Sequence, residues 1–359
     1  MKVAIFSPAL HAVSGVSTHV NMLLGSRLVR DFELRHFQVG SEGRAEGKLQ
    51  RLIRFVCSPF QLAFFLITRR VDVVHINTSV NRNAFWRDVM YLLTAKLLRR
   101  KVVNQFHSGF GPQKLVDGGF AAWVMRRFLL GSDVVVVLCS SALQEHRAFE
   151  PRVAIQVVPN AIDASGLLAS ARTANMHQPL SLISIGRLVK TKGLVETITA
   201  MGVLKKQGVR FQLRVAGSGP DEAEIRALVA RLQLEDEVDF IGPVFGPAKD
   251  RLLLHADVLV FPTYFEGMPY ALLEAMAAGC VPVTCPVGGI PDVMSDAVHG
   301  YLVPTQDAAA VAKAIARLDA DRAQLARMSE AGRGRIAEAY TVDRLADRFA
   351  QVYRRVGMK

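Results

Sequence analysis

The sequence predicts an α/β protein with two doubly wound, Rossmann-like domains that face a central cleft. Short runs rich in Val and Ile alternate along the chain with longer segments of helical periodicity. Most of the short runs are largely apolar, which is typical of parallel strands buried on both faces of a sheet. The alternation begins again after a polar stretch near the middle of the chain, and 359 residues are enough for two domains of ordinary size.

The first domain is predicted to span residues 1–168, and a polar, aperiodic linker follows at 169–178. Segments with helical periodicity separate its strands, for example at Asn83–Leu98. Ligands of such sheets bind at the carboxyl ends of the strands, so we expect functional residues in the loops that follow them. The strands expected here are Val3–Phe6, Glu33–Val39, Val71–Ile76, Lys101–Phe106, Val134–Leu138 and Ile155–Val158.

The second domain is predicted to span residues 179–340. Its helices include Gly193–Gln207 and Pro269–Ala278, since Gly208 and Gly279 suit helix C-termini. A basic amphipathic helix at Val342–Val356, within 341–359, is predicted to pack back toward the first domain. The strands expected here are Leu180–Ser184, Phe211–Ala216, Val238–Ile241, Val258–Phe261 and Cys280–Thr284.

The positive charge lies almost entirely in the first half of the chain. Residues 1–175 hold 22 Lys and Arg against 11 Asp and Glu, a net charge of +11 out of a total of +12. This asymmetry indicates either an anionic ligand or surface, or a basic surface that serves solubility. The four cysteines show no CxxC spacing, so we expect a reducing cytoplasm and no disulfide framework.

The segment "GKLQRLIRFVCSPFQLAFFLITRR", residues 47–70, mixes cations with aromatic and aliphatic residues. No apolar run in the chain is long enough to span a bilayer. A basic helix of this kind suits the surface of an anionic membrane, with Arg51, Arg54, Arg69 and Arg70 at the headgroups. Alternatively, its apolar face packs on the sheet of its own domain.

The stretch "FEGMPYALLEAMAAGCVPV", residues 265–283, places one glutamate in a loop and another in the helix that follows. Glu266 comes shortly after the strand Val258–Phe261, and Glu274 lies in the middle of the helix. The backbone N–H groups of Met268–Ala271, at the helix start, form a site for an anion. A sugar nucleotide has sugar hydroxyls, a diphosphate and ribose hydroxyls in that order. These groups would match the loop carboxylate, the helix start and the second carboxylate. The alternative is one capping and one solvated glutamate.

A second motif, "SIGRLVKTKG", covers residues 184–193 at the end of a predicted strand. Gly186 gives the backbone freedom there, and Arg187 and Lys192 supply two cations. A guanidinium and an ammonium at the carboxyl end of a strand suit a diphosphate. The alternative is a pair of solvated charges at the start of a helix.

Together with "GGIPDV", these two motifs resemble the retaining glycosyltransferases of family 4, which have the GT-B fold. The resemblance covers most of the C-terminal half. It is looser in the N-terminal half, at "SPALHAVSGVSTHV", "HINTS" and "NQFHSG". Ser14 replaces a glycine that is common in the family, and Asp292 replaces the usual glutamate.

The resemblance implies that Arg187 and Lys192 stabilise a leaving diphosphate, that Glu266 contacts hydroxyls of the transferred sugar and that Glu274 binds the ribose. It implies that His107 faces the donor sugar, and it makes His107, Arg187, Lys192 and Glu266 the predicted catalytic residues. We predict that Asn77 and His107 lie on the acceptor side, and that His19 faces its own domain. The predicted donor-binding residues are Gly15, Val16, Gly186, Arg187, Lys192, Gly242, Glu266, Gly267, Met268, Pro269, Tyr270, Ala271 and Glu274.

The resemblance further implies transfer of a sugar from a UDP- or GDP-linked donor, with retention of configuration, to a glycan or lipid-linked acceptor. This would serve the synthesis of a cell-surface polysaccharide or glycolipid, in the cytoplasm or at the inner face of the plasma membrane. We expect no metal, no other cofactor and no nucleic acid. A sugar-nucleotide 2-epimerase of the same fold and an inactive nucleotide-sugar-binding subunit are the alternatives.

Two further stretches resemble motifs of other functions, namely dinucleotide binding and metal binding. "VAGSGPDEAEIR" mimics a dinucleotide fingerprint, but Glu222 occupies the position of the third glycine. "DAD" at Asp319–Asp321 resembles a metal-binding motif, yet it lies in a helical segment and not at a strand end, so we expect it to be solvated.

Overall fold

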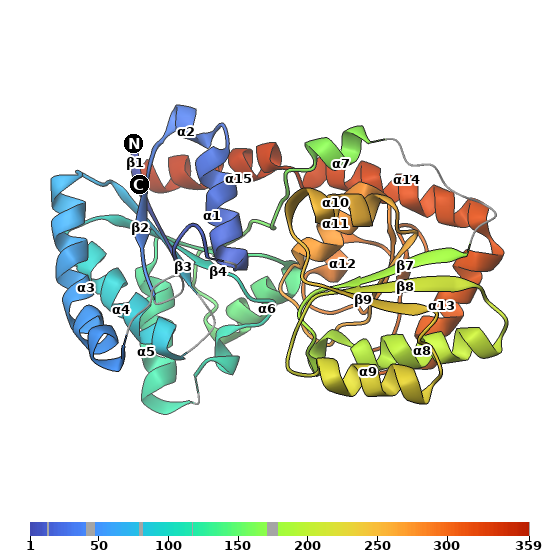
Figure 1. The fold of residues 1–359 in the computed structure, drawn as a ribbon. Helices are drawn as coiled ribbons and strands as arrows, with labels where there is room; N and C mark the ends of the chain where they lie inside the picture. Colours follow the sequence, from blue (N-terminus) through green and yellow to red (C-terminus); the bar gives the residue numbers. More distant parts are fainter. Residues whose placement is uncertain (13, 41–46, 79–81, 117, 171–178, 359) are drawn as a thin grey trace. The chain divides into compact units, whose positions relative to one another are not determined.

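A computed structural model describes residues 1–12, 14–40, 47–78, 82–116, 118–170 and 179–358. Its contacts divide the chain into two compact units, Met1–Ala161 with Val342–Lys359 and Ile162–Thr341. Each unit contains one six-stranded sheet, and every strand pair in both sheets is parallel (Figure 1). The predicted α/β class with two parallel sheets is therefore confirmed.

The sheet of the first unit has the strand order β2-β1-β3-β4-β5-β6. Because all strands run in the same direction, the loops after β3 and β4, which are neighbours, emerge side by side. The strands are β1 (Lys2–Ser7), β2 (Glu33–Gln38), β3 (Val73–Thr78), β4 (Lys101–Phe106), β5 (Val134–Val137) and β6 (Ile155–Val157). The helices are α1 (Gly15–Gly25), α2 (Leu28–Asp31), α3 (Lys48–Thr68), α4 (Arg82–Leu97), η1 (Pro112–Lys114), α5 (Gly119–Gly131), α6 (Ser140–Phe149) and, at the end of the chain, α15 (Val342–Gly357).

The sheet of the second unit has the order β12-β11-β10-β7-β8-β9. Figure 1 shows α8 and α9 on one face of this sheet and α10 and α11 on the other. The strands are β7 (Leu180–Ile185), β8 (Phe211–Ala216), β9 (Val238–Gly242), β10 (Val258–Phe261), β11 (Val281–Thr284) and β12 (Tyr301–Leu302). The helices are α7 (Ser165–Ala169), η2 (Lys190–Lys192), α8 (Leu194–Lys206), α9 (Glu222–Arg231), α10 (Gly246–Leu254), α11 (Tyr270–Ala278), α12 (Ile290–Val293), α13 (Ala308–Ala320) and α14 (Arg322–Ala339).

The division between the units precedes the boundary that we predicted at residue 168. Helix α7 belongs to the second unit, because Arg333 of α14 donates hydrogen bonds to the carbonyls of Leu167 and Leu168 at 3.2 and 2.6 Å. One sequence prediction is wrong in detail. Pro269 does not lie in the first turn of α11 but precedes it as the N-cap residue, with an extended backbone at φ −74° and ψ 127°.

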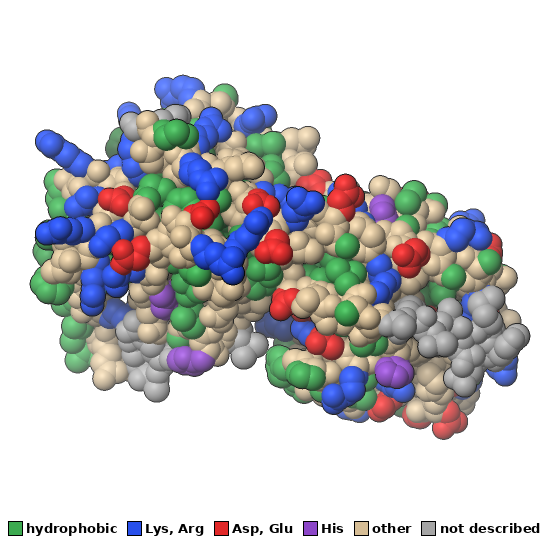
Figure 2. All heavy atoms as spheres, turned by 90° about the horizontal axis from the view of Figure 1, so that it is seen from above, with side chains coloured by type: hydrophobic (Ala, Val, Ile, Leu, Met, Phe, Trp, Pro, Cys, Tyr) green, Lys and Arg blue, Asp and Glu red, His purple; other side chains and the backbone are tan. Residues whose placement is uncertain are grey.

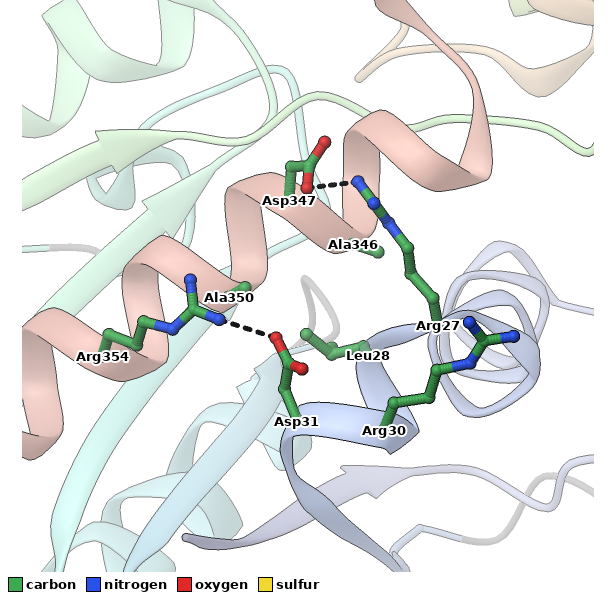
Figure 3. A pocket seen from close by; sticks show the side chains of 8 residues that line it. All are labelled: Arg27, Leu28, Arg30, Asp31, Ala346, Asp347, Ala350 and Arg354. Atoms are coloured by element: carbon green, nitrogen blue, oxygen red, sulfur yellow. Dashed lines mark hydrogen bonds and ion pairs between the residues drawn. The ribbon is translucent and has the colours of Figure 1, made fainter.

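Helix α15 completes the core of the first unit. Leu345, Phe349 and Tyr353 are fully buried in a cluster that includes residues of β1, β3 and β4. Two ion pairs join α15 to α2 around a pocket of about 250 Å³ (Figure 3). Asp31 accepts from Arg354 at 2.6 Å, and Arg27 pairs with Asp347. Since these charged groups are half-exposed, most of the stability of this contact comes from the apolar face of α15.

Three histidines lie close together in the first unit, and two of them, His19 and His75, are fully buried. His75 on β3 bonds the Tyr353 hydroxyl through Nδ1 at 2.7 Å and Gln105 Oε1 through Nε2 at 3.0 Å. The rings of His19 and His107 meet edge to face at 5.0 Å. Burial lowers the pKa of His19 to about 4 and that of His75 to about 3, and it lowers the pKa of His107 well below its usual value. All three imidazoles are therefore neutral at pH 7.

This cluster should make the protein sensitive to mild acid. Below pH 6.5 these histidines bind protons in the unfolded chain but not in the folded one, so stability falls as the pH drops from 6.5 toward 4. We expect a loss of about 2 kcal/mol for each of His19 and His75 between pH 7 and pH 5. Asp88 acts in the opposite sense, because burial raises its pKa to about 6. Urea unfolding at the two pH values measures the difference.

His19→Leu should make that pH dependence shallower, because the buried imidazole that stays neutral in the folded chain is removed. Equal stability of the unmodified protein at pH 7 and pH 5 would contradict the prediction.

Candidate functional site

The order of strands in the second sheet brings two distant motifs together. β7 and β10 are neighbours, so the loops after them share one edge of the sheet. The backbone N–H of Tyr264 donates to the carbonyl of Thr191 at 2.9 Å, and the Thr263 hydroxyl donates to the same carbonyl at 3.1 Å. "SIGRLVKTKG" and "FEGMPY" therefore form one structure, although about seventy residues separate them in the chain.

The ion pair between Lys192 and Glu266 is the central feature of this edge. Glu266 Oε1 accepts from Lys192 Nζ, and the Thr263 hydroxyl, which can donate its one proton either to Glu266 or to the Thr191 carbonyl, lies 3.2 Å from Oε1. Only 9% of Glu266 is exposed. Burial raises the pKa of Glu266, while Lys192 and Thr263 oppose the rise. A carboxylate and an ammonium group are thus held together at the carboxyl ends of β7 and β10.

Two glycines allow the backbones to approach closely enough for this arrangement. A Cβ at Gly193, where φ is +72°, would lie 2.0 Å from the carbonyl oxygen of Pro262. A Cβ at Gly288, where φ is +56°, would lie 2.0 Å from the carbonyl oxygen of Glu266. The "GGIPD" loop after β11 therefore supports the Glu266 loop directly, and the N–H of Gly289 donates to the carbonyl of Gly267 at 2.6 Å.

The second glutamate, Glu274, forms an ion pair with a different lysine. Lys249 on α10 donates to Glu274 Oε1 at 2.7 Å, and both side chains are about four-fifths buried. Burial raises the pKa of Glu274, and Lys249 opposes the rise. The buried hydroxyl of Tyr270 has no hydrogen-bond partner among the described residues, and burial raises its pKa as well. Because Tyr270 begins α11, the N–H groups of the first turn lie beside these polar groups.

The other predicted residues of the second unit lie along the same edge. Gly186 and Arg187 follow β7 directly, and both are exposed. No carboxylate among the described residues pairs with Arg187, so its guanidinium is open to a ligand. Gly242 ends β9, and its carbonyl accepts from the N–H of Gly217 at 2.9 Å. Its φ of +72° favours glycine.

The predicted residues of the first unit form a separate group. Asn77 is the penultimate residue of β3 and His107 follows β4, so the strand order makes them neighbours. Asn77 Nδ2 donates to the carbonyl of Phe6 at 2.8 Å, and its Oδ1 lies 2.7 Å from His107 Nε2. Since Oδ1 only accepts, Nε2 of the neutral ring carries the proton and Nδ1 has a free lone pair. His19 packs against this ring inside its own unit, as the sequence predicts.

Gly15 and Val16 belong to the first turn of α1 rather than to a loop. Ser14 is the N-cap, and its hydroxyl accepts from the N–H of Ser17 at 3.1 Å. Ser14, which replaces the glycine common in the family, thus begins this helix as a capping residue. The N–H groups of Gly15 and Val16, in the first turn, have no acceptor within the helix. They could therefore donate hydrogen bonds to an anion.

Sequence reasoning missed two residues of the site. Thr263 comes only two residues after β10, and its place at a strand end was the available signal. For Lys249 the sequence holds no signal, because its contact with Glu274 arises from the packing of α10 on α11. The "DAD" residues, which we expected to be solvated, stabilise the helix ends instead: Asp319 pairs with Arg322, and the exposed Asp321 caps α14. In the described ranges, no three His, Cys, Asp or Glu side chains are arranged to hold a metal ion.

Comparison with known proteins matches both halves of the chain to glycosyltransferase families. The sequence family described as "Glycosyl transferases group 1" matches residues 170–335, and "Glycosyltransferase Family 4" matches residues 13–165. The amylovoran biosynthesis glycosyltransferase AmsK of Erwinia amylovora is 32% identical over 323 residues, which are 86% of this chain and 75% of AmsK. WcaL of Escherichia coli (strain K12), named for colanic acid biosynthesis, is 41% identical over 154 residues, or 40% of this chain and 37% of WcaL.

Solved structures agree on the fold. Sucrose-phosphate synthase from Thermosynechococcus elongatus has a TM-score of 0.76 at 22% identity, over 99% of this chain and 98% of that one. HepE from Anabaena, solved in complex with UDP, has a TM-score of 0.77 at 16% identity, over 98% and 99%. At this identity the likeness concerns the fold alone, and it is the GT-B fold. With AmsK matched at 32% identity over three quarters of its length, the chain belongs to the family 4 glycosyltransferases of GT-B fold.

Proposed function

We propose that this glycosyltransferase moves a sugar from a UDP- or GDP-linked donor, with retention of configuration, to a glycan or lipid-linked acceptor. The reaction would serve the synthesis of a surface polysaccharide or glycolipid at the cytoplasmic face of the membrane. Support comes from the names of AmsK and WcaL, which place them in amylovoran and colanic acid biosynthesis. Further support comes from HepE, which was solved with UDP and with UDP-glucose.

The observation that carries the proposal is the Lys192–Glu266 pair beside the exposed Arg187. A sugar diphosphate offers anionic oxygens to the ammonium and hydroxyls to the carboxylate, so it can satisfy both members of the pair at once. Arg187 adds a planar guanidinium for the same diphosphate. Glu274 would accept hydrogen bonds from the ribose hydroxyls, and its ion pair with Lys249 would be weakened as a result.

The transfer step forms a bond between the acceptor oxygen and the anomeric carbon, and breaks the bond from that carbon to the phosphate oxygen. We assign the acceptor's proton to the departing phosphate oxygen, on the face from which it leaves. Glycosidases place two carboxylates across the scissile bond, whereas here both glutamates are engaged with lysines. Arg187, Lys192 and the start of α11 would stabilise the charge that grows on the diphosphate. The lone pair of His107 Nδ1 would accept from a sugar hydroxyl.

A screen of nucleotide sugars tests the proposal. We expect one donor to bind, and to release its nucleoside diphosphate faster when the correct acceptor is added. Proton NMR of the product should show the anomeric configuration of the donor. Conversion of the donor into its C2 epimer without an acceptor would support a 2-epimerase instead. Binding without any turnover would support an inactive subunit, and no binding of any nucleotide sugar would contradict the proposal.

Catalysis is also predicted to need no divalent metal, because Arg187, Lys192 and the first turn of α11 supply the positive charge for the diphosphate. Turnover after exhaustive treatment with EDTA should equal that of the untreated enzyme. The control is a metal-dependent glycosyltransferase that EDTA inactivates under the same conditions. Loss of activity with EDTA and its recovery with Mg²⁺ or Mn²⁺ would count against the prediction.

A further inference from the structure

Helix α3 carries apolar side chains on two faces, and only one of them is covered. Leu62 and Leu66 are fully buried in the first unit. On the other side, Phe60 is 75% exposed and Phe64 is 71% exposed. The two alternatives that we considered for this helix are therefore both realised in part: one face packs on its own unit, and a second apolar face remains open. The further exposed apolar residues of α3 are Leu49, Ile53, Phe55, Val56 and Ile67.

A second group of exposed apolar side chains lies on the neighbouring helices α4 and α5. Trp86 stacks on Phe120 with ring centroids 6.3 Å apart, and Phe120 stacks on Trp123 at 5.8 Å. Phe120 is 71% exposed and Trp123 is 53% exposed. Next to this aromatic row lies a pocket of about 610 Å³. Its walls are apolar except for Arg127 and two indole N–H groups, and they come from all three helices, for example Phe55, Met90 and Phe128.

Apart from one buried aspartate, the charged residues in the sequences of these three helices are all cations. In the sequences of α3, α4 and α5 the only acidic residue is Asp88, which is fully buried and paired with Arg87. Arg127 stands 5.5 Å from the ring of Trp123. Exposed cations also follow the helices, at Arg69, Arg70 and Arg99. Figure 2, which views the molecule from above, shows Lys and Arg side chains among hydrophobic and a few acidic ones on the first unit.

We infer that the open surface of α3, α4 and α5 docks onto an anionic lipid bilayer, with its aromatic residues among the acyl chains and its cations at the headgroups. Exposed apolar side chains in this number on three neighbouring helices mark an interaction site. The excess of cations without exposed carboxylates on the three helices favours an anionic partner and opposes self-association of this surface. In the described residues no helix is long and apolar enough to cross a bilayer, so the contact would be peripheral.

The pocket makes the inference more specific. An apolar pocket of this volume is within the usual range for small-molecule sites, yet apart from Arg127 and the indole N–H groups of Trp86 and Trp123 its side chains are apolar. An acyl chain fills such a space, and Arg127 can meet the phosphate of the same lipid. A glycan would need more partners for its hydroxyls than these walls offer. The inference deepens the membrane part of the proposed function, and it is tested without nucleotide sugar, so that either can fail alone.

Tryptophan fluorescence gives a direct test, because the chain has two tryptophans and both, Trp86 and Trp123, lie on this surface. The probes are vesicles of phosphatidylcholine with 30% phosphatidylglycerol, against phosphatidylcholine alone. We expect the anionic vesicles to shift the emission to shorter wavelength, and lipids brominated in the acyl chains to quench it. Part of the binding should survive in high salt, because apolar insertion is not screened.

Variants separate insertion from simple charge attraction. Phe60→Asp with Phe64→Asp should weaken vesicle partitioning about tenfold or more, and Arg127→Ala should weaken it about fivefold. The matched control is Val298→Asp, an exposed apolar residue of the second unit, which should not change partitioning. Circular dichroism should confirm that all three variants are folded.

Other outcomes would overturn the inference. Absence of quenching by brominated chains, or binding lost entirely in high salt, would mean that the aromatic residues do not enter the bilayer. An emission shift that grows with protein concentration in the absence of vesicles would mean that a second copy covers the surface. A shift caused by a soluble glycan alone would assign the aromatic row to carbohydrate.

Discussion

Arg187→Ala should slow sugar transfer by about 10²–10³-fold while the fold stays intact. The negative charge on the diphosphate grows as the sugar leaves, so the loss should appear mainly in kcat rather than in the affinity for the donor. Arg187 is exposed and pairs with no described carboxylate, so its removal leaves no buried charge unpaired. Steady-state kinetics with the donor found in the screen measures both quantities.

Lys192→Ala should cause a loss of similar size, but with an additional signature. Lys192 is the main charge that opposes the rise in the pKa of the buried Glu266, so that pKa should rise further without it. The acid limb of the pH–rate profile should therefore move to higher pH in Lys192→Ala and stay in place in Arg187→Ala.

Lys190 offers a matched control on the same short helix. It is exposed and pairs with Glu224 at 3.0 Å, away from Glu266. Lys190→Ala should keep normal turnover and the normal pH profile. If Arg187→Ala and Lys192→Ala both turn over like the unmodified enzyme, the assignment of the diphosphate to this edge is wrong.

The two glutamates should respond differently to substitution, which is the second large effect that we expect. Glu266→Gln should abolish transfer yet bind the nucleoside diphosphate normally, because Glu266 is assigned to the sugar and glutamine still accepts from Lys192. Glu274→Ala should lower the affinity for the free nucleoside diphosphate by about ten- to a hundredfold, since a buried ribose hydroxyl loses its acceptor. Calorimetric titration with the free nucleoside diphosphate separates the two roles.

Lys249→Ala controls for the ion pair that Glu274→Ala also breaks. If the ribose contact matters, Lys249→Ala should weaken nucleotide binding less than Glu274→Ala does. Equal effects of Glu266→Gln and Glu274→Ala on nucleotide affinity would refute the division of roles between the two carboxylates.

The inner strands were predictable because strands buried on both faces are mostly apolar, as in Val258–Phe261, which matches to the residue. Lys101–Phe106 and Phe211–Ala216 also match to the residue, although Gln212 and Arg214 are exposed and alternate with buried residues. The strand Tyr301–Leu302 was missed, because two residues are too few to show any period. The boundary between the units was placed late, because α7 joins the second unit through contacts of Arg333, which lies far away in the chain.

The sequence by itself determined the two-sheet α/β class, the family and the identity of the motif residues. Only the tertiary structure decided how these residues combine. Lys192 meets Glu266 because β7 and β10 are neighbours in the sheet although they are distant in the chain. Lys249 meets Glu274 only because α10 packs on α11. The open apolar face of α3 was equally undetermined, because a periodic pattern records that side chains are apolar, whereas the packing of the other helices decides which of them are covered.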